Sequence, residues 1–341
     1  MVVLRKMKAV IFTRPERAII DEVDIPRMDD EDVLVEIEYS GVSNGTERWC
    51  LMDKLNPDGA PPLTYPHVPG YQAAGIIREI GSKVLGLKPG DRVFSRNCKS
   101  PKGWKGTWWG GHTGYHVAHY QSVIKLPDGV STQEASFLLL AQVGFNGAIR
   151  PRVIPGDAAV VIGDGLVGQY AAQVLKYRGA YVIMTGLMQD RLKLASLYSA
   201  DEVINAGKRD IRQYIKEKYP EGVSLVVETA SKLDLIRTAI DLIKRNGQVV
   251  LNGYYPQGEN LINYHWLRDK ETTIYCPNSR TRERLELTLD LIEQGYMQVK
   301  GLITHEFDIT KAPDAYTNLL DNSAHFLGMV FNWKRGSGLK S

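Results

Sequence analysis

The sequence predicts an α/β protein with two domains, one rich in β-strands and one built on a doubly wound parallel sheet. The chain has 341 residues, which is enough for about two domains. Short apolar runs separated by Gly and Pro turns occupy residues 7–127, a pattern typical of a small barrel or sandwich. From residue 131 onwards, strand-like and helix-like segments alternate, which predicts a parallel sheet covered by helices.

The strands of the first part are indicated by alternation and by turns. In Asp32–Tyr39, apolar residues recur at every second position, as in a half-buried strand. Lys88–Asp91 reads Lys-Pro-Gly-Asp, which is a turn signal between two further strands. The expected strands are Lys8–Phe12, Asp32–Tyr39, Gly70–Ile80, Asp91–Phe94, Gly111–Ala118 and Ser122–Lys125.

The second part begins with Ser131–Glu134, a capping box ahead of the helical stretch Ala135–Ala141. Its later expected elements are the strands Ser224–Glu228, Gln248–Leu251 and Thr272–Cys276, the helix Leu233–Lys244 with Gly247 as its C-cap, and the helix Arg282–Gln294. The strand-like segments Leu302–Phe307 and Gly328–Trp333 resemble the first part. We therefore expect a first domain of residues 1–148 and 281–341 and a second domain of residues 149–280.

Three glycines after a buried strand carry the first functional signal. The apolar run Ala158–Ile162 leads into G-x-G-x-x-G, and a helical pattern and a second apolar run, Ala180–Met184, follow. This strand–turn–helix–strand unit binds dinucleotides, because the glycines let the pyrophosphate approach the helix N-terminus. An ordinary glycine-rich turn is the alternative. The expected cofactor contacts are Asn44, Gly163, Gly165, Leu166, Val167, Gly168, Thr185, Gly186, Arg191 and Lys208.

The end of the second strand bears on the choice of cofactor. NAD enzymes place Asp or Glu about 20 residues after the glycine loop, where it binds the ribose 2′-hydroxyl. Here the strand ends in Thr185-Gly186, and no acid follows before Asp190. Arg191 and Lys208 could neutralise a 2′-phosphate. The sequence therefore favours NADP, with NAD as the alternative.

Composition excludes several other classes of protein. The net charge of +3 gives no strong attraction to nucleic acid. No apolar run approaches the roughly 18 residues of a membrane helix, and the stretch after the basic start, Met1–Lys8, is too short for a signal peptide. The three cysteines, Cys50, Cys98 and Cys276, form neither a disulfide framework nor a four-cysteine zinc lobe. We expect a cytoplasmic protein with reduced thiols.

Several short motifs point to one superfamily. They are Met7–Val10, Val33–Val42, Val68–Gly70, Lys88–Val93, Leu126–Asp128 and Pro155–Asp157. With them, the chain resembles the medium-chain dehydrogenase/reductase superfamily over essentially its whole length. The resemblance implies a GroES-like catalytic domain interrupted by a Rossmann domain. It also implies hydride transfer between a nicotinamide and an alcohol or carbonyl carbon of a small-molecule substrate.

Three positions depart from the zinc enzymes of that superfamily. Those enzymes have a cysteine where this chain has Ser43, and Gly-His-Glu where it has Gly70-Tyr71-Gln72. Residues 137–147, where the third ligand is expected, contain no Cys, His, Asp or Glu. Because a catalytic zinc needs three protein ligands, we expect no zinc. The histidines that could be offered as stray ligands, and that are more simply structural, are His67, His112 and His116.

Without a metal, a side chain must polarise the substrate oxygen and exchange its proton. The residues at and near the missing ligand positions are the candidates. Tyr71 offers a hydroxyl donor, and Ser43 with Thr46 could form a relay that ends at Glu47. The alternative is that Ser-Asn-Gly-Thr is only a turn and Glu47 only a cap.

Two stretches bear on the substrate. Ser40–Glu47 and Pro66–Gly75 are similar to bacteriochlorophyllide dehydrogenases, which oxidise a hydroxyethyl group on a chlorin ring. Lys99–Tyr120 is rich in Trp, Gly and His, and exposed aromatic faces suit stacking on a sugar or a flat ring. The alternative is a loop that packs its own tryptophans or lines a subunit contact. The expected substrate contacts are Trp49, Trp108, Trp109 and His112.

The sequence thus predicts a zinc-independent NAD(P)-dependent oxidoreductase of a secondary alcohol or ketone. The substrate would be a polyol, a sugar derivative or a ring-bearing alcohol. Alternatives are quinone or enone reduction, and nicotinamide binding without catalysis. The strand Thr272–Cys276 has apolar and β-branched residues, which suit a sheet edge that pairs with the same edge of a second chain. We therefore expect a homodimer or homotetramer.

Overall fold

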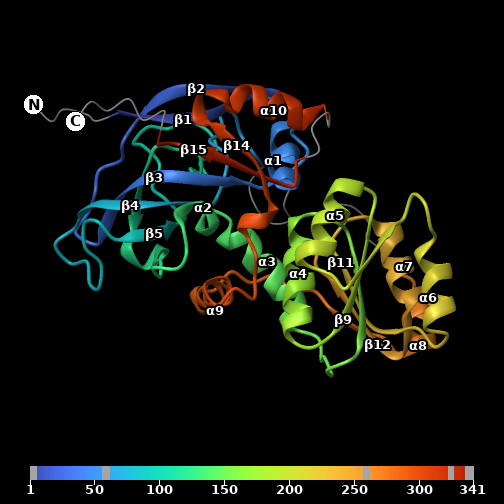
Figure 1. Cartoon of the computed structure of the whole chain (residues 1–341). Coiled ribbons are helices and arrows are strands. Elements are labelled where there is room, and N and C mark those ends of the chain that lie inside the picture. Colours follow the sequence, from blue (N-terminus) through green and yellow to red (C-terminus); the bar gives the residue numbers. More distant parts are fainter. Residues whose placement is uncertain (1–5, 56–61, 256–261, 322–325, 335–341) are drawn as a thin grey trace, which may run out of the picture. The chain divides into compact units, whose positions relative to one another are not determined.

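The computed structural model describes residues 6–55, 62–255, 262–321 and 326–334 (Figure 1). The chain divides into two compact units, unit 1 (Met1–Leu138 with Ile303–Ser341) and unit 2 (Leu139–Leu302). This division by contacts assigns residues 139–148 and 281–302 to unit 2, whereas the sequence analysis assigns them to the catalytic domain. The domain boundaries expected from the sequence, 1–148 with 281–341 and 149–280, stay a prediction.

Unit 1 is the β-rich part. Its strands are β1 (Lys6–Arg14), β2 (Arg17–Asp24), β3 (Asp32–Val42), β4 (Ala73–Ile80), β5 (Arg92–Ser95), β6 (Tyr115–His119), β7 (Val123–Lys125), β14 (Ile303–Asp308) and β15 (Gly328–Asn332). β1 and β2 form an antiparallel ribbon. The other strands form one sheet in the order β14-β15-β3-β4-β5-β7, with β6 paired to β3. The predicted return of the C-terminal strands is confirmed, since β15 pairs with β3 (Figure 1).

Short helices complete unit 1. They are α1 (Asn44–Leu51), α2 (Thr132–Ala135) and α10 (Ala312–Leu320). The predicted capping box is confirmed, because the Ser131 hydroxyl accepts from the Glu134 backbone and the Glu134 carboxylate accepts from the Ser131 backbone. The hydrophobic core of unit 1 contains residues from both its N-terminal and its C-terminal segment. Val10, Ile37 and Leu51 pack in one cluster with Tyr316 and Trp333.

Unit 2 is a six-stranded parallel sheet in the order β10-β9-β8-β11-β12-β13. The strands are β8 (Ala158–Ile162), β9 (Tyr181–Gly186), β10 (Glu202–Asn205), β11 (Val223–Glu228), β12 (Ile243–Leu251) and β13 (Thr273–Tyr275). β8 and β11 are buried along their whole length, as the continuous apolar runs predict for central parallel strands. The predicted doubly wound sheet is confirmed.

The helices of unit 2 are α3 (Leu138–Ile149), α4 (Leu166–Tyr177), α5 (Gln189–Tyr198), α6 (Ile211–Lys218), α7 (Leu233–Leu242), α8 (Tyr264–Lys270) and α9 (Arg282–Glu293). Figure 1 shows α4 and α5 on one side of the sheet and α7 on the other. One predicted detail is wrong. Gly247 is not a C-cap but lies inside β12, which begins directly after α7 at Ile243. In the part of the chain that the structure describes, no helix is long and apolar enough to cross a membrane.

Candidate functional site

The glycine-rich turn follows β8, and each of its glycines is required for a different reason. Gly163 has φ +116°, a conformation that side chains disfavour. A Cβ on Gly168 would lie 2.1 Å from the Gly163 carbonyl oxygen, so only glycine lets α4 pack this close to the turn. A Cβ on Gly165 would meet no atom within 4 Å. The fold therefore does not require glycine at 165, whereas an approaching pyrophosphate would.

The first turn of α4 completes this nucleotide-binding turn. Leu166 and Val167 begin the helix directly after its N-cap, Gly165, which makes no side-chain capping bond. The backbone N–H groups at this helix N-terminus can donate hydrogen bonds to phosphate, and the helix dipole favours an anion there. The residues present therefore fit a dinucleotide. Thr185 is buried at the end of β9, and its hydroxyl has no hydrogen-bond partner among the described residues.

The two basic residues predicted to read a 2′-phosphate differ in their surroundings. Lys208 is exposed, and its ammonium lies 3.4 Å from Gln189 Oε1 at the start of α5. Arg191 is half-buried and faces the carboxylate of Asp164, with 3.5 Å between Nη1 and Oδ1. Asp164 was missed by the sequence analysis. The sequence signal that could have indicated Asp164 is its position, an acidic residue between Gly163 and Gly165.

In unit 1 the structure places Glu47 differently from the predicted relay. Glu47 is 0% exposed, in the middle of α1. Its Oε1 accepts the Ser43 backbone N–H at 2.8 Å, and its Oε2 lies 2.9 Å from His112 Nε2. The Tyr316 hydroxyl donates to the same Oε2. Burial and this carboxylate hold the pKa of Tyr316 well above its usual value, so Tyr316 remains a donor. Glu47 is thus enclosed by protein groups.

His112 belongs to the same buried cluster. It is 0% exposed, and its Nδ1 lies 2.8 Å from Ser40 Oγ, which also accepts the Trp333 indole N–H at 2.9 Å. If Ser40 donates to Nδ1 and Nε2–H donates to Glu47, every polar atom in this chain of contacts has a partner. The predicted contact of His112 with substrate is not supported by this arrangement. We call Ser40, Glu47, His112, Tyr316 and Trp333 the Glu47 cluster.

The remaining candidates lie near this cluster. Ser43 is buried at the start of α1, where its backbone bonds Glu47. Asn44 donates from Nδ2 to the carbonyls of Phe326 and Leu327 at 3.2 and 3.0 Å, which ties α1 to the segment before β15. Thr46 and Tyr71 are half-buried. Gly70, with φ +77°, turns the backbone directly before Tyr71, and a Cβ on it would lie 2.6 Å from the His112 ring.

The tryptophans pack largely on their own unit. Trp104 and Trp108 meet edge to face at 5.3 Å and lie against the apolar cluster around Val68. Trp109 contacts the ring of His67 at 5.0 Å, and Trp49 packs on the main core. All four are half-buried. The alternative interpretation, a loop that packs its own tryptophans, therefore accounts for much of this stretch.

The positions of the expected zinc ligands do not form a metal site. Ser43 and Gln72 are neutral, and the Gln72 amide contacts the Gly41 carbonyl at 3.4 Å. Among the described residues, no group of three or more His, Cys, Asp or Glu side chains could hold a metal ion. The donor set present therefore does not fit zinc.

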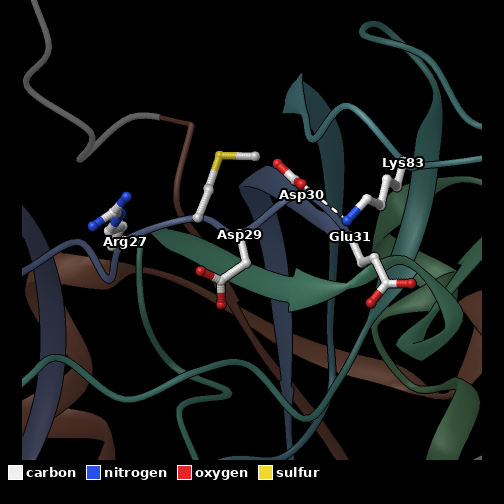
Figure 2. Close-up of a pocket in the computed structure, with 6 residues that line it drawn as sticks. Arg27, Asp29, Asp30, Glu31 and Lys83 are labelled. Carbon is white, nitrogen blue, oxygen red and sulfur yellow. Dashed lines mark ion pairs between the residues drawn. The ribbon is translucent and has the colours of Figure 1, made fainter.

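A hollow at the surface of unit 1 is made by the segment between β2 and β3, together with Lys83 (Figure 2). Its lining residues are Arg27, Met28, Asp29, Asp30, Glu31 and Lys83. Figure 2 shows Asp30 and Lys83 pointing toward each other. Lys83 Nζ lies 3.1 Å from Asp30 Oδ2. Asp29 instead pairs with Lys99, which lowers its pKa. These pairings describe a solvated charged surface rather than a catalytic site.

Comparisons with known proteins agree with both units. Residues 29–128 match the alcohol dehydrogenase GroES-like domain, and residues 167–294 match the zinc-binding dehydrogenase family. An alcohol dehydrogenase of Geobacillus stearothermophilus is 30% identical over 74% of this chain and 79% of its own length. The chain belongs to the zinc-type alcohol dehydrogenase family. The predicted enzyme class, an NAD(P)-dependent alcohol dehydrogenase of the medium-chain superfamily, is thereby confirmed.

One further relative and one solved structure cover almost the whole chain. A sorbitol dehydrogenase of Halalkalibacterium halodurans is 28% identical over 91% of this chain and 95% of its own length. A zinc-binding dehydrogenase from Sinorhizobium meliloti 1021, solved with NADP bound, superposes with a TM-score of 0.85 at 22% identity, covering 96% of this chain and 100% of the other. At this identity the second likeness shows the shared fold.

One cofactor prediction is wrong. The sequence analysis expects no zinc, and the family to which residues 167–294 belong is that of zinc-binding dehydrogenases. Membership of this family overturns the expectation drawn from the changed ligand positions. Among the described residues, the side chains at those positions do not form a zinc ligand set.

Proposed function

We propose that this dehydrogenase uses NADP to interconvert a secondary alcohol and a ketone on a polyol or sugar derivative. The observation that carries the proposal is the glycine-rich turn after β8. There Gly163 and Gly168 are required by the fold, while Gly165 leaves open space beside the N-terminus of α4. The similarity to a sorbitol dehydrogenase supports a substrate with several hydroxyl groups.

Charge around the end of β9 supports NADP. Gly186 carries no side chain, Arg191 pairs with Asp164 of the glycine-rich turn, and Lys208 contacts Gln189 at the start of α5. The carboxylate of Asp164 is opposed by Arg191. The cations of Arg191 and Lys208 would attract a 2′-phosphate, which supports NADP as the cofactor.

Hydride exchange with the substrate carbon is the chemistry that a bound nicotinamide supplies. The chain must orient the substrate and exchange the proton of its hydroxyl group. We assign the hydrogen bond to the substrate oxygen to Tyr71, and we keep the hydroxyls of Ser43 and Thr46 as a proton relay. Glu47 acts through Ser43, because its carboxylate fixes the Ser43 backbone. Asn44 holds α1 in place through the Phe326 and Leu327 carbonyls.

The test is a panel of substrates assayed with NADP and with NAD at the absorbance of the reduced nicotinamide. Sorbitol and other polyols, their ketoses, ring-bearing secondary alcohols, quinones and enones make up the panel. Turnover of polyols with NADP is the expected result. Turnover of quinones or enones alone would replace the proposal by the reductase alternative. Turnover of ring-bearing alcohols alone would favour the substrate class of the bacteriochlorophyllide dehydrogenases.

We also propose that two copies pair through the edge of the unit 2 sheet. β13 (Thr273–Tyr275) is the last strand of that sheet, and in the described chain it is bonded to β12 on one side. An edge with apolar and β-branched residues is commonly covered by another strand. The expected mass in solution is about twice the 38.2 kDa of one chain, or a higher even multiple. A mass of one chain at micromolar concentration would refute this pairing.

A further inference from the structure

The carboxylate of Asp164 leaves the glycine-rich turn and reaches the end of β9. Its Oδ2 accepts the backbone N–H groups of Leu187 and Met188, both at 2.8 Å. Its Oδ1 faces Arg191 Nη1 at 3.5 Å. The carboxylate is nine-tenths buried, so these contacts fix its position.

Asp164 takes the place of a side chain at the end of the strand. A Cβ on Gly186 would lie 2.3 Å from Asp164 Oδ2, so no side chain fits at residue 186 while the carboxylate is there. In NAD enzymes the acid that binds the ribose 2′-hydroxyl comes from about this strand position. Here a carboxylate is present at that place, but the glycine turn supplies it.

The backbone around this carboxylate is held by Gln169 of α4. Gln169 is fully buried, and its Nε2 lies 3.4 Å from the Asp164 carbonyl and 3.1 Å from the Arg191 carbonyl. One amide therefore joins the glycine turn to α5. The backbones from which the Asp164 and Arg191 side chains extend are therefore held by the same buried amide.

We propose that Asp164 is a positioning residue that sets the choice between NAD and NADP by holding the guanidinium of Arg191. This inference rests on the proposed use of a nicotinamide nucleotide. A 2′-phosphate must draw the Arg191 guanidinium away from Asp164, which costs affinity for NADP. The 2′-hydroxyl of NAD carries no charge and does not compete with Asp164 for Arg191. Asp164 therefore reduces the preference for NADP that Gly186, Arg191 and Lys208 would give alone.

Asp164→Asn tests this role, because the amide oxygen can still accept from Leu187 and Met188 while the charge is lost. The dissociation constants of NADP⁺ and NAD⁺ are measured for the full chain by titration calorimetry. In Asp164→Asn the preference for NADP⁺ over NAD⁺ rises about tenfold. In Arg191→Gln that preference falls. In the double variant Asp164→Asn no longer changes the preference, because the residue through which it acts is absent.

Asp201→Asn is the matched control at the opposite end of the same strand. Asp201 Oδ2 accepts the Val182 backbone N–H at 2.8 Å, and Oδ1 pairs with Lys176 at 3.0 Å. This substitution removes the same kinds of contact from β9, so it reports loss of stability alone. Its NADP⁺/NAD⁺ preference stays that of the unsubstituted chain.

An unchanged preference in Asp164→Asn, or an equal change in the Arg191→Gln background, would overturn the inference. If Asp164→Asn does not fold, Arg191→Gln still tests the inference. An unchanged preference for NADP⁺ over NAD⁺ in Arg191→Gln would show that Arg191 does not affect cofactor choice, and Asp164 could then not act through it. Binding of neither nucleotide by the unsubstituted chain would overturn the proposed function itself. The two failures are therefore distinguishable.

Discussion

Glu47 Oε2 lies 2.9 Å from His112 Nε2, and both side chains are 0% exposed. The pair joins α1 to the segment before β6, and Tyr316 adds a donor from α10. Burial of a carboxylate is tolerated when hydrogen bonds replace its water, and removal of one partner leaves a buried group unsatisfied.

His112→Phe should therefore destabilise unit 1 by about 3–5 kcal/mol, as expected when a buried pair is broken. Urea unfolding measures the change. His119→Phe is the matched control, because His119 and Glu31 form an exposed pair with 3.7 Å between Nε2 and Oε2. Its effect should stay within about 0.5 kcal/mol. Equal effects of the two substitutions would show that the Glu47 cluster does not support the fold.

Tyr71→Phe should lower kcat by about 10²-fold or more, because the phenol that bonds the substrate oxygen is lost. Cofactor affinity should not change. Steady-state rates and nucleotide titration separate the two effects. Tyr120→Phe, a half-exposed tyrosine of the same unit, is the control. An unchanged kcat in Tyr71→Phe would remove Tyr71 from the mechanism and shift the role to Thr46.

The two glycines Gly165 and Gly168 should respond differently to alanine. Gly168→Ala places a Cβ 2.1 Å from the Gly163 carbonyl and should destabilise unit 2. Gly165→Ala meets no atom within 4 Å and should leave the melting temperature unchanged, while nucleotide affinity falls because the methyl group lies where the pyrophosphate approaches. Thermal melting with and without nucleotide reads both effects. Unchanged affinity in Gly165→Ala would place the phosphates elsewhere.

Two buried histidines make unit 1 sensitive to acid. Burial lowers the pKa of His67 and of His116 from 6.5 to about 4, because the charged imidazolium loses its water. Between these values the unfolded chain binds protons that the folded chain does not, so stability falls as the pH drops from about 6.5 to 4. Each histidine contributes on the order of 2–3 kcal/mol to this loss.

The measurement is the free energy of unfolding at pH 7 and pH 4.5. His116→Asn removes one titrating group, so the difference between the two pH values should shrink relative to the unsubstituted chain. His265→Asn, at an exposed histidine of α8, should leave the difference as it was. If the free energy of unfolding of His116→Asn falls between pH 7 and pH 4.5 as much as that of the unsubstituted chain, His116 does not cause the loss of stability in acid.

The sequence predicts the sheet of unit 2 well, because apolar runs and glycine turns are local signals. The predicted strand Ala158–Ile162 has the same first and last residues as β8. The predicted helix Arg282–Gln294 is one residue longer than α9. The sequence does not predict β2, α1 and α10 of unit 1. β2 shows little alternation of burial, and α1 begins with Asn-Gly, residues that favour turns. Tertiary contacts of Glu47 and Asn44 override this local preference.

The candidate sites were predicted less fully, for a physical reason. Local spacing indicates the glycine turn, but contacts between distant residues decide what Glu47 and Asp164 do. Glu47 meets His112 and Tyr316 across 65 and 269 residues. Asp164 meets Leu187 and Met188 across 23 and 24 residues. No spacing rule covers such separations, so the sequence alone does not predict these contacts of Glu47 and Asp164.

The discontinuity of unit 1 has a consequence for synthesis on the ribosome. Tyr316 and Trp333, which complete the Glu47 cluster and the core, emerge after all of Leu139–Leu302. Unit 2 can fold while β3 still lacks β15 as its neighbour. Until then the nascent chain exposes an open strand edge, and Glu47 lacks the hydrogen bond from the Tyr316 hydroxyl. Chaperones that bind exposed strands would thus meet the first half of this chain for as long as the second half is being made.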